Sequence, residues 1–157
     1  MKKIVLILLI LFMISSCSTG EKEIYLLSKD YTGYIILVFN QEDGVEKKYK
    51  EDKRVYEIPS SGILKTQFKP NSGWSEFSEF YYENSNSKKI PYTYEFKDLN
   101  TDSIVVYGGT TGTANRDLAG TSVVKFSKYY IGNKVQIQEA IDKADSFDYV
   151  KIADDKD

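Results

Sequence analysis

The sequence contains no histidine, and this absence narrows the chemistry open to the chain. Without histidine there is no Ser-His-Asp triad, no usual general base near pH 7, and no ligand of the kind that most zinc sites use. Arginine is also scarce, because Arg54 and Arg116 are the only two. Since proteins rely heavily on arginine to bind phosphate, we expect no surface that reads phosphate or nucleic acid.

Cysteine occurs once, at Cys17, so no disulfide can form within the chain. An unbroken apolar run of eleven residues, Ile4–Ile14, follows two lysines and precedes this cysteine. A helix that spans a bilayer needs about 20 apolar residues, so the run predicts the hydrophobic part of an export signal. The segment Ile14–Cys17 (Ile-Ser-Ser-Cys) resembles the lipobox of bacterial lipoproteins. The resemblance implies cleavage between Ser16 and Cys17 and a diacylglyceryl group on the sulfur of Cys17.

A lipid on Cys17 would explain why an exported chain keeps a single thiol, since an unpaired cysteine otherwise needs a disulfide partner. Two acyl chains anchor a protein stably, whereas one chain binds only marginally. We therefore expect an exported protein that is held on membrane lipid of the bacterial cell envelope through acylated Cys17. The alternative, an ordinary secretory signal with an incidental cysteine, stays open.

Removal of residues 1–16 as a signal peptide leaves 141 residues, the usual size of a single domain. We expect a lipidated tether at 17–23, a single β-rich domain at 24–153 and an acidic tail at 154–157. This mature part has 19 basic and 23 acidic residues, a formal charge of −4. Such a charge does not favour nucleic acid or anionic headgroups.

Alternating and continuous apolar segments predict about eight to ten short strands. One helix is expected at about 133–146, because an apolar stripe at i, i+3, i+4 and i+7 begins at Ile137 and Asn133 with Gln136 resembles a capping box. Residues 110–120 are expected to form a polar loop. The chain is therefore predicted to be mainly β, as a single β-sandwich or a partly open barrel with one C-terminal amphipathic helix. The expected strands include 34–39, 45–49, 54–58, 63–68, 77–82, 90–96, 103–107, 121–131 and 147–152.

A series of short motifs lies in the first part of the mature chain: Tyr25-Leu26-Leu27, Asp30-Tyr31-Thr32-Gly33, Val38-Phe39-Asn40-Gln41, Arg54-Val55-Tyr56 and Gly62-Ile63-Leu64-Lys65-Thr66-Gln67-Phe68. With these motifs the chain resembles a family of small bacterial lipoproteins that is catalogued only as a domain of unknown function. The resemblance is strong over about 25–68 and looser beyond. It implies no activity, because the family has none assigned.

Two polar motifs resemble ligand loops but lack essential positions. Tyr107–Gly112 could suggest a phosphate loop, yet it lacks the Gly-Lys-Ser/Thr ending and the helix that follows, so a flexible hairpin loop is favoured. Asp98, Asn100 and Asp102 have the first spacings of a calcium loop. The later positions that need glycine and a bidentate glutamate hold other residues, so a solvated turn is favoured. We therefore expect no cofactor and no metal.

Aromatic and acidic side chains gather at residues 74–82 of the sequence. Trp74, Phe77 and Tyr81 could form a surface that contacts a partner or a glycan, and Trp74, beside a Pro/Gly loop, is expected to be exposed. Core packing is favoured for the cluster as a whole, because aromatic residues commonly fill strands and cores. Glu76 and Glu79 form a carboxylate pair of the kind used in glycoside hydrolysis.

Two functions follow from these patterns. The first is a non-enzymatic, lipid-anchored β-domain that contacts another envelope protein or a polymer. The second is an envelope hydrolase that uses carboxylates on a carbohydrate-type substrate. A cleft with convergent carboxylates and a raised carboxyl pKa would favour the enzyme, whereas an exposed aromatic patch would favour the binding module.

Overall fold

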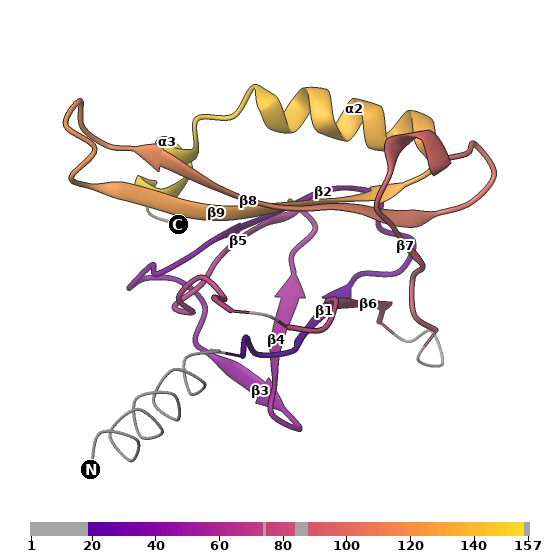
Figure 1. Ribbon diagram of the computed structural model, residues 1–157, viewed down its shortest axis with the longest axis horizontal. Helices are drawn as coiled ribbons and strands as arrows, with labels where there is room; N and C mark the ends of the chain where they lie inside the picture. Colours follow the sequence, from indigo (N-terminus) through magenta and orange to yellow (C-terminus); the bar gives the residue numbers. More distant parts are fainter. Residues whose placement is uncertain (1–18, 74, 84–87, 156–157) are drawn as a thin grey trace, which may run out of the picture.

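The computed structural model describes residues 19–73, 75–83 and 88–155, and their elements form three layers (Figure 1). A four-stranded sheet packs against one face of a five-stranded sheet, and two α-helices cover the other face. The predicted mainly β, sandwich-type fold with a C-terminal helix is confirmed. The elements are β1 (Glu23–Leu27), β2 (Gly33–Val38), β3 (Lys48–Lys50), β4 (Lys53–Ile58), β5 (Ile63–Lys65), β6 (Glu79–Tyr82), β7 (Tyr92–Thr93), η1 (Phe96–Asp98), β8 (Val105–Asn115), β9 (Val123–Gly132), α2 (Lys134–Asp145) and α3 (Tyr149–Asp154).

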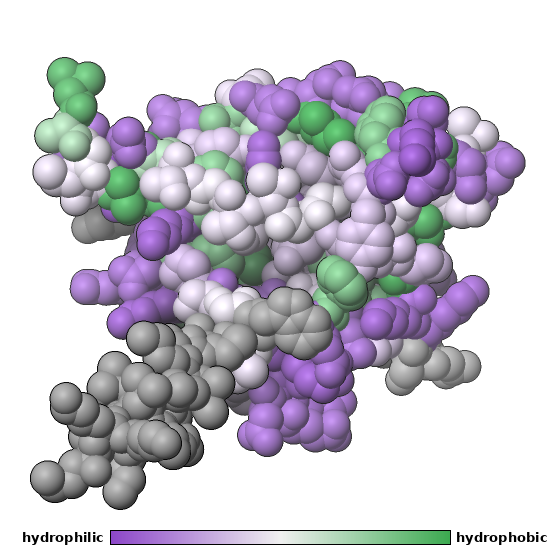
Figure 2. Space-filling view, viewed as in Figure 1, coloured by the Kyte–Doolittle hydropathy of each residue, from purple (hydrophilic) through white to green (hydrophobic). Residues whose placement is uncertain are grey.

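The four-stranded sheet has the order β3-β4-β1-β6, in which β4, β1 and β6 are parallel and β3 is antiparallel to β4. Glu51 and Asp52 join β3 to β4 with φ angles of 50° and 62°, as two-residue hairpin turns of type I′ require. Lys48 and Lys50 are exposed on edge strand β3, where charge opposes pairing with another chain. The charged run Lys50–Lys53 between two strand-like segments predicts a hairpin with a charged tip, and the structure confirms it. Figure 2 shows this hairpin as a hydrophilic protrusion at the bottom.

The five-stranded sheet has the order β5-β2-β9-β8-β7. Successive side chains of a strand point to opposite faces, and β2 uses both faces. Ile35 and Leu37 pack into the interior between the sheets, whereas Ile36 and Val38 pack beneath the helices. A continuous apolar run such as 34–39, rich in branched residues, predicts a central strand that is buried on both faces, and the structure confirms this.

The hairpin of β8 and β9 is longer than the sequence predicted. A polar loop was expected at 110–120, but residues 110–115 continue β8 in register with β9. Most of these residues are polar and exposed, so the sequence shows no apolar alternation here. Gly112 allows the two strands to approach, because a Cβ at this position would collide with the ring of Phe126. Leu118 lies fully exposed in the turn that joins β8 to β9.

The C-terminal helix begins as predicted, and a second helix follows it. The side chain of Asn133 accepts from the backbone N–H of Gln136, and the Gln136 side chain accepts from the N–H of Asn133, both at 3.0 Å. This capping box starts α2. The strand predicted at 147–152 is wrong, because the carboxylate of Asp148 accepts from two backbone N–H groups and starts α3. A short apolar run does not by itself distinguish a strand from a helix.

The folded body extends past both ends of the predicted domain, 24–153. Glu23, which was expected in the tether, is the first residue of β1 and is buried. Asp154, which was expected in the acidic tail, ends α3 and accepts a hydrogen bond from Arg116 at 2.7 Å. Polar contacts of these charged side chains therefore hold both ends on the body.

Candidate functional site

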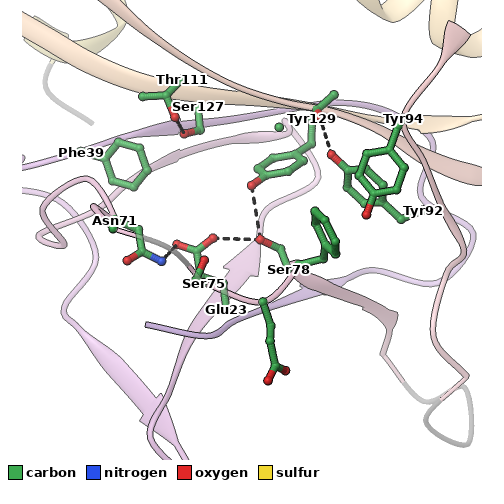
Figure 3. A pocket seen from close by; sticks show the side chains of 15 residues that line it. Glu23, Phe39, Asn71, Ser75, Ser78, Tyr92, Tyr94, Thr111, Ser127 and Tyr129 are labelled. Carbon is green, nitrogen blue, oxygen red and sulfur yellow. Dashed lines mark hydrogen bonds between the residues drawn. The ribbon is translucent and has the colours of Figure 1, made fainter. Parts of the chain in front are cut away.

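A cavity of about 570 Å³ opens between the two sheets (Figure 3). Its volume lies in the range of 300–1,000 Å³ that is usual for small-molecule sites. One wall comes from the start of β1 and the segment that leads into β6, and the other from β7, β8 and β9. The described lining residues are Glu23, Phe39, Asn71, Gly73, Ser75, Glu76, Phe77, Ser78, Tyr92, Tyr94, Gly108, Gly109, Thr111, Ser127 and Tyr129.

The carboxylate of Glu23 is the most constrained group in the cavity, and its residue is only 7% exposed. One oxygen accepts from Asn71 Nδ2 at 3.1 Å and from the Tyr56 hydroxyl at 3.3 Å. The other accepts from Ser78 Oγ at 3.0 Å and from the Tyr25 hydroxyl at 3.2 Å. A carboxylate offers about four lone-pair positions, so all of them are occupied. None of the ion pairs between described residues includes Glu23.

The tyrosines around Glu23 remain protonated donors. Burial raises the pKa of Tyr25, Tyr56 and Tyr129, and the negative charge of Glu23 raises each pKa further. The rings also fix one another, since Tyr25 stacks on Phe80 with centroids 4.4 Å apart. The carboxylate is therefore held in one position by neutral, rigid side chains.

A β-bulge shapes the opposite wall. The register of β8 against β9 shifts at Gly108 and Gly109, whose φ angles are 110° and 90°. A Cβ on Gly109 would lie 2.8 Å from the Tyr92 hydroxyl and 3.2 Å from the ring of Tyr129. The Tyr92 hydroxyl donates to the carbonyl of Gly108. The flexible hairpin loop expected at 107–112 is thus a bulged strand, and the bulge gives two tyrosine rings access to the cavity.

Aromatic rings form the rim of the cavity. Phe77 and Tyr94 are 67% and 58% exposed, and their ring centroids are 5.0 Å apart. Tyr92 continues this wall inward, 4.9 Å from Tyr94. Elsewhere in the lining, the hydroxyls of Thr111 and Ser127 lie 3.1 Å apart. The site therefore combines an exposed aromatic rim with a polar interior.

An ion pair fastens the first described residues to the lip of the cavity. Arg54 is only 8% exposed, and its guanidinium donates to the carboxylate of Glu21 at 2.6 Å and to the carbonyl of Lys69 at 2.7 Å. Asn71 donates to the carbonyl of Glu21 at 2.6 Å and accepts from its N–H at 3.0 Å. Two chain segments far apart in sequence are thus joined beside Glu23.

The structure does not bring the predicted carboxylate pair together. Glu76 lines the cavity and forms an ion pair with Lys22 at 2.8 Å. Glu79 is not among the lining residues, and it pairs with Lys53 at 3.0 Å and Lys89 at 3.6 Å. The hydrogen bond from Lys53 lowers the pKa of Glu79, whereas a general acid needs a raised one.

The predicted aromatic surface is divided. Phe77 lies at the rim of the cavity. Tyr81 is not part of the lining, because it follows the buried Phe80 on β6 and so points to the other face of the sheet. Trp74, Ser16 and Cys17 lie outside the described residues. Their proposed roles stay predictions.

Sequence reasoning missed most of the polar and aromatic groups of the cavity, among them Glu23, Asn71, Tyr92, Tyr94 and Tyr129. Glu23 carried a usable signal, because it lies two residues before Tyr25 and four before Leu27 and therefore shares their buried face. The others come from segments that are far apart in the sequence. No local pattern links them.

The segment from Asp98 to Asp102, which resembles a calcium loop, ends in a turn as predicted. The side-chain oxygen of Asn100 accepts from the N–H of Asp102 at 3.0 Å and of Ser103 at 2.9 Å, as expected for a capped turn. Across residues 19–73, 75–83 and 88–155, no group of three acidic or cysteine side chains could hold a metal ion. In the same part of the chain, no helix has both the length and the apolar character needed to cross a bilayer.

Comparisons with known proteins give a family and a related fold. No curated protein matches the chain. A crystal structure of a candidate lipoprotein from Bacillus anthracis is similar, with a TM-score of 0.50 and 18% identity, over 74% of this chain and 73% of that chain. At this identity the similarity concerns the fold. A family model described as "Family of unknown function (DUF6843)" matches residues 19–141, well beyond the motifs at 25–68, and the chain belongs to this family.

Proposed function

We propose that the chain is a lipid-anchored, non-enzymatic binding module of the bacterial cell envelope. Its cavity between the sheets takes up part of an envelope protein or polymer. The observation that carries this proposal is the combination of an exposed aromatic rim, Phe77 and Tyr94, with polar groups held in fixed positions around Glu23. Rigid rings supply contact area at little entropic cost, and a few fixed polar groups orient the ligand.

The carboxylates favour binding over hydrolysis. Glu79 lies outside the cavity, so it cannot act on the same bond as Glu76. Glu23 shares the cavity with Glu76, but each lone-pair position of Glu23 already accepts a hydrogen bond. An attacking water or a leaving oxygen would therefore have to displace one of these donors before Glu23 could act on it.

The anchor is supported by the sequence around Cys17. The charged n-region, the short apolar run and the Ile-Ser-Ser-Cys segment together favour processing at this cysteine. The structure of the body agrees with an anchor close to the site, because Glu21, four residues further on, is bound to the lip of the cavity.

Intact-mass analysis of protein from native membranes tests the anchor. We expect a chain that begins at Cys17 and carries the added mass of a diacylglyceryl group. A Cys17→Ser variant should incorporate no labelled fatty acid. An unlipidated chain that retains the leader, or one cut at another bond, would contradict the proposal.

A capture experiment tests the cavity. Full-length protein in mild detergent is immobilised and exposed to cell-envelope extract, and the bound material is compared with that bound by a Phe77→Ala, Tyr94→Ala double variant. We expect capture to fall about tenfold, since buried aromatic anchors dominate binding. Tyr49→Ala is the matched control, because Tyr49 is 53% exposed and not part of the lining. Equal capture by the double variant and the wild type would exclude the cavity as the binding site.

A further inference from the structure

We infer that the cavity recognises an organic cation of the alkylammonium type, and that it favours a head group without N–H donors. The inference rests on the proposed binding role and names the ligand class for that site. It follows from three properties of the cavity: its charge, its aromatic wall and the occupied lone pairs of Glu23.

The charge of the lining has one sign. Glu23 and Glu76 are acidic, and none of the described lining residues is lysine or arginine. The donors on Glu23 are two phenols, one hydroxyl and one amide, all of them neutral. Charges interact strongly where water is excluded, and buried charges are usually paired. Arg54, which lies opposite Glu23 in the register of β1 and β4, forms its ion pair with Glu21. A cation that enters the cavity would be attracted by both lining carboxylates, whereas an anion would be repelled.

The ion pair of Glu76 with Lys22 does not prevent a cation from binding in the cavity. It is formed by two exposed side chains, 51% and 65% exposed for the lysine and the glutamate. Such surface pairs contribute little stability, so a ligand can compete with Lys22. The same pair shows that the alkylammonium group of Lys22 can reach Glu76, a carboxylate of the cavity lining.

The aromatic wall supplies the second attraction. Ring faces attract cations, most strongly where the cation loses water. Phe77, Tyr92 and Tyr94 touch one another, with centroids 4.9 to 6.2 Å apart. Because the rings are in contact, the cation would lie against this wall and not between two rings. In Figure 3 the rings of Tyr92 and Tyr94 and the carboxylate of Glu23 lie on different sides of the pocket.

The occupied lone pairs of Glu23 select the kind of cation. A primary ammonium needs three acceptors, and Glu23 could accept only by giving up a bond such as that from Ser78 or Asn71. A quaternary ammonium has no N–H groups and therefore needs only charge and ring faces. Glu23 then acts through its field alone, and its donors keep their bonds.

Titration with choline and with its uncharged isostere 3,3-dimethyl-1-butanol tests the charge directly. The two probes have the same shape, so only the positive charge distinguishes them. Calorimetry on the full-length protein in a non-ionic detergent should give at least tenfold tighter binding of choline, weakening as salt is added. Equal or tighter binding of the isostere would overturn the inference. Competition by glycerophosphocholine as strong as that by choline would support the same class with a lipid headgroup as its source, and competition by choline alone would support a free solute.

Variants locate the binding. Glu23→Gln removes the charge and keeps the shape, and we expect it to reduce choline affinity about tenfold. If circular dichroism shows that this variant does not fold, two substitutions of Tyr94 test the inference instead. Tyr94→Phe keeps the ring and should bind choline like the wild type, whereas Tyr94→Leu should bind several-fold more weakly. Tyr49→Leu, at an exposed ring outside the cavity, is the matched control. Equal affinities of the two Tyr94 variants would overturn the inference.

The outcomes separate this inference from the proposed function. If choline does not bind, and a neutral sugar binds with the same dependence on Tyr94, the cavity is a binding site but the inferred ligand class is wrong. If choline does not bind and the rim variants also leave envelope capture unchanged, both are wrong.

Discussion

The two interiors of this molecule differ in composition. Among the described residues, eight of the nine buried side chains beneath the helices are aliphatic, and this is the aliphatic interior. Between the sheets six of the fourteen buried side chains are aromatic, and this is called the aromatic interior below. The aliphatic set includes Ile36, Val38, Val124, Ile137, Ala140 and Ala144. The aromatic set includes Tyr25, Tyr56, Phe68, Phe80 and Tyr129. Aliphatic groups pack without directional bonds, whereas each buried phenol needs a hydrogen-bond partner. The comparison indicates that one interior mainly stabilises the fold and the other also positions polar groups.

The polar groups of the aromatic interior are satisfied. Among the described residues, every buried side-chain nitrogen or oxygen has a hydrogen-bond partner. Glu23 provides acceptors for Tyr25 and Tyr56, and Tyr129 lies 3.4 Å from Ser78, which also donates to Glu23. One carboxylate therefore organises this interior, and the predictions below contrast it with the aliphatic one.

The largest effect is expected in the aliphatic interior. Ile137 is fully buried on α2, and Ile137→Ala should lower the free energy of unfolding by about 2–5 kcal/mol, because it leaves a cavity. Urea denaturation measures the loss. Val135→Ala is the control on the same helix, since Val135 is 53% exposed. Choline affinity of the folded variant should not change, and a change would show that the two interiors are not separable.

Removal of the central carboxylate should come next. Glu23→Ala leaves buried donors without an acceptor and should lower the free energy of unfolding by about 1–3 kcal/mol. The same substitution at Glu57, whose side chain is about half exposed in its ion pair with Lys48, should change stability little. Urea denaturation of both variants gives the comparison. An equal loss for the two would mean that the hydrogen bonds to Glu23 contribute nothing.

The helix cap should have a smaller effect. Asn133→Ala removes the side-chain acceptor at the start of α2 and should cost about 1 kcal/mol. Gln138→Ala, on an exposed position of the same helix, is the control. Thermal denaturation should show the loss without any change at the cavity. A Tm equal to that of wild type would indicate that packing alone sets the start of the helix.

The smallest change in the free energy of unfolding at neutral pH is expected for Tyr31→Phe. Tyr31 packs against the aromatic interior. Burial raises the pKa of Tyr31 to about 12, whereas an unfolded tyrosine ionises near about 10. The stability linked to this shift is complete below about pH 10 and is lost as pH rises through about 12. Tyr31→Phe should therefore lose less stability than wild type above pH 10, measured by thermal denaturation across that range. Parallel curves for the two proteins would contradict this.

Local signals predicted the elements well. The run at 34–39 lies in a strand buried on both faces, and Asn133 with Gln136 starts a helix, because neighbouring residues determine both features. The segment 147–152 was misread because its apolar residues fit either periodicity, and Asp148 decided for a helix. The local pattern also failed at 110–115, because these residues are extended only through their pairing with β9, which is not visible in the local sequence.

The cavity was beyond local reasoning. Its walls come from β1, the segment before β6, and β7 to β9, which meet only when the two sheets pack. The proposed carboxylate pair, Glu76 and Glu79, was chosen for closeness in sequence, yet only Glu76 lines the cavity. Glu23 shows the opposite case, because its spacing from Tyr25 was informative but the residue was assigned to the tether at 17–23.

If Cys17 carries the proposed lipid, the attachment of Glu21 to the lip of the cavity limits the distance between the cavity and the bilayer. Four peptide units join Cys17 to Glu21, and a fully extended chain covers about 3.5 Å per residue, or about 14 Å in all. With acyl chains on the sulfur of Cys17, the mouth of the cavity would stay within about 14 Å of the lipid attachment. The cavity would therefore sample solutes that are concentrated near the membrane surface. Inserting Gly-Ser repeats after Ser18 would lengthen the tether and let the cavity move away from that surface.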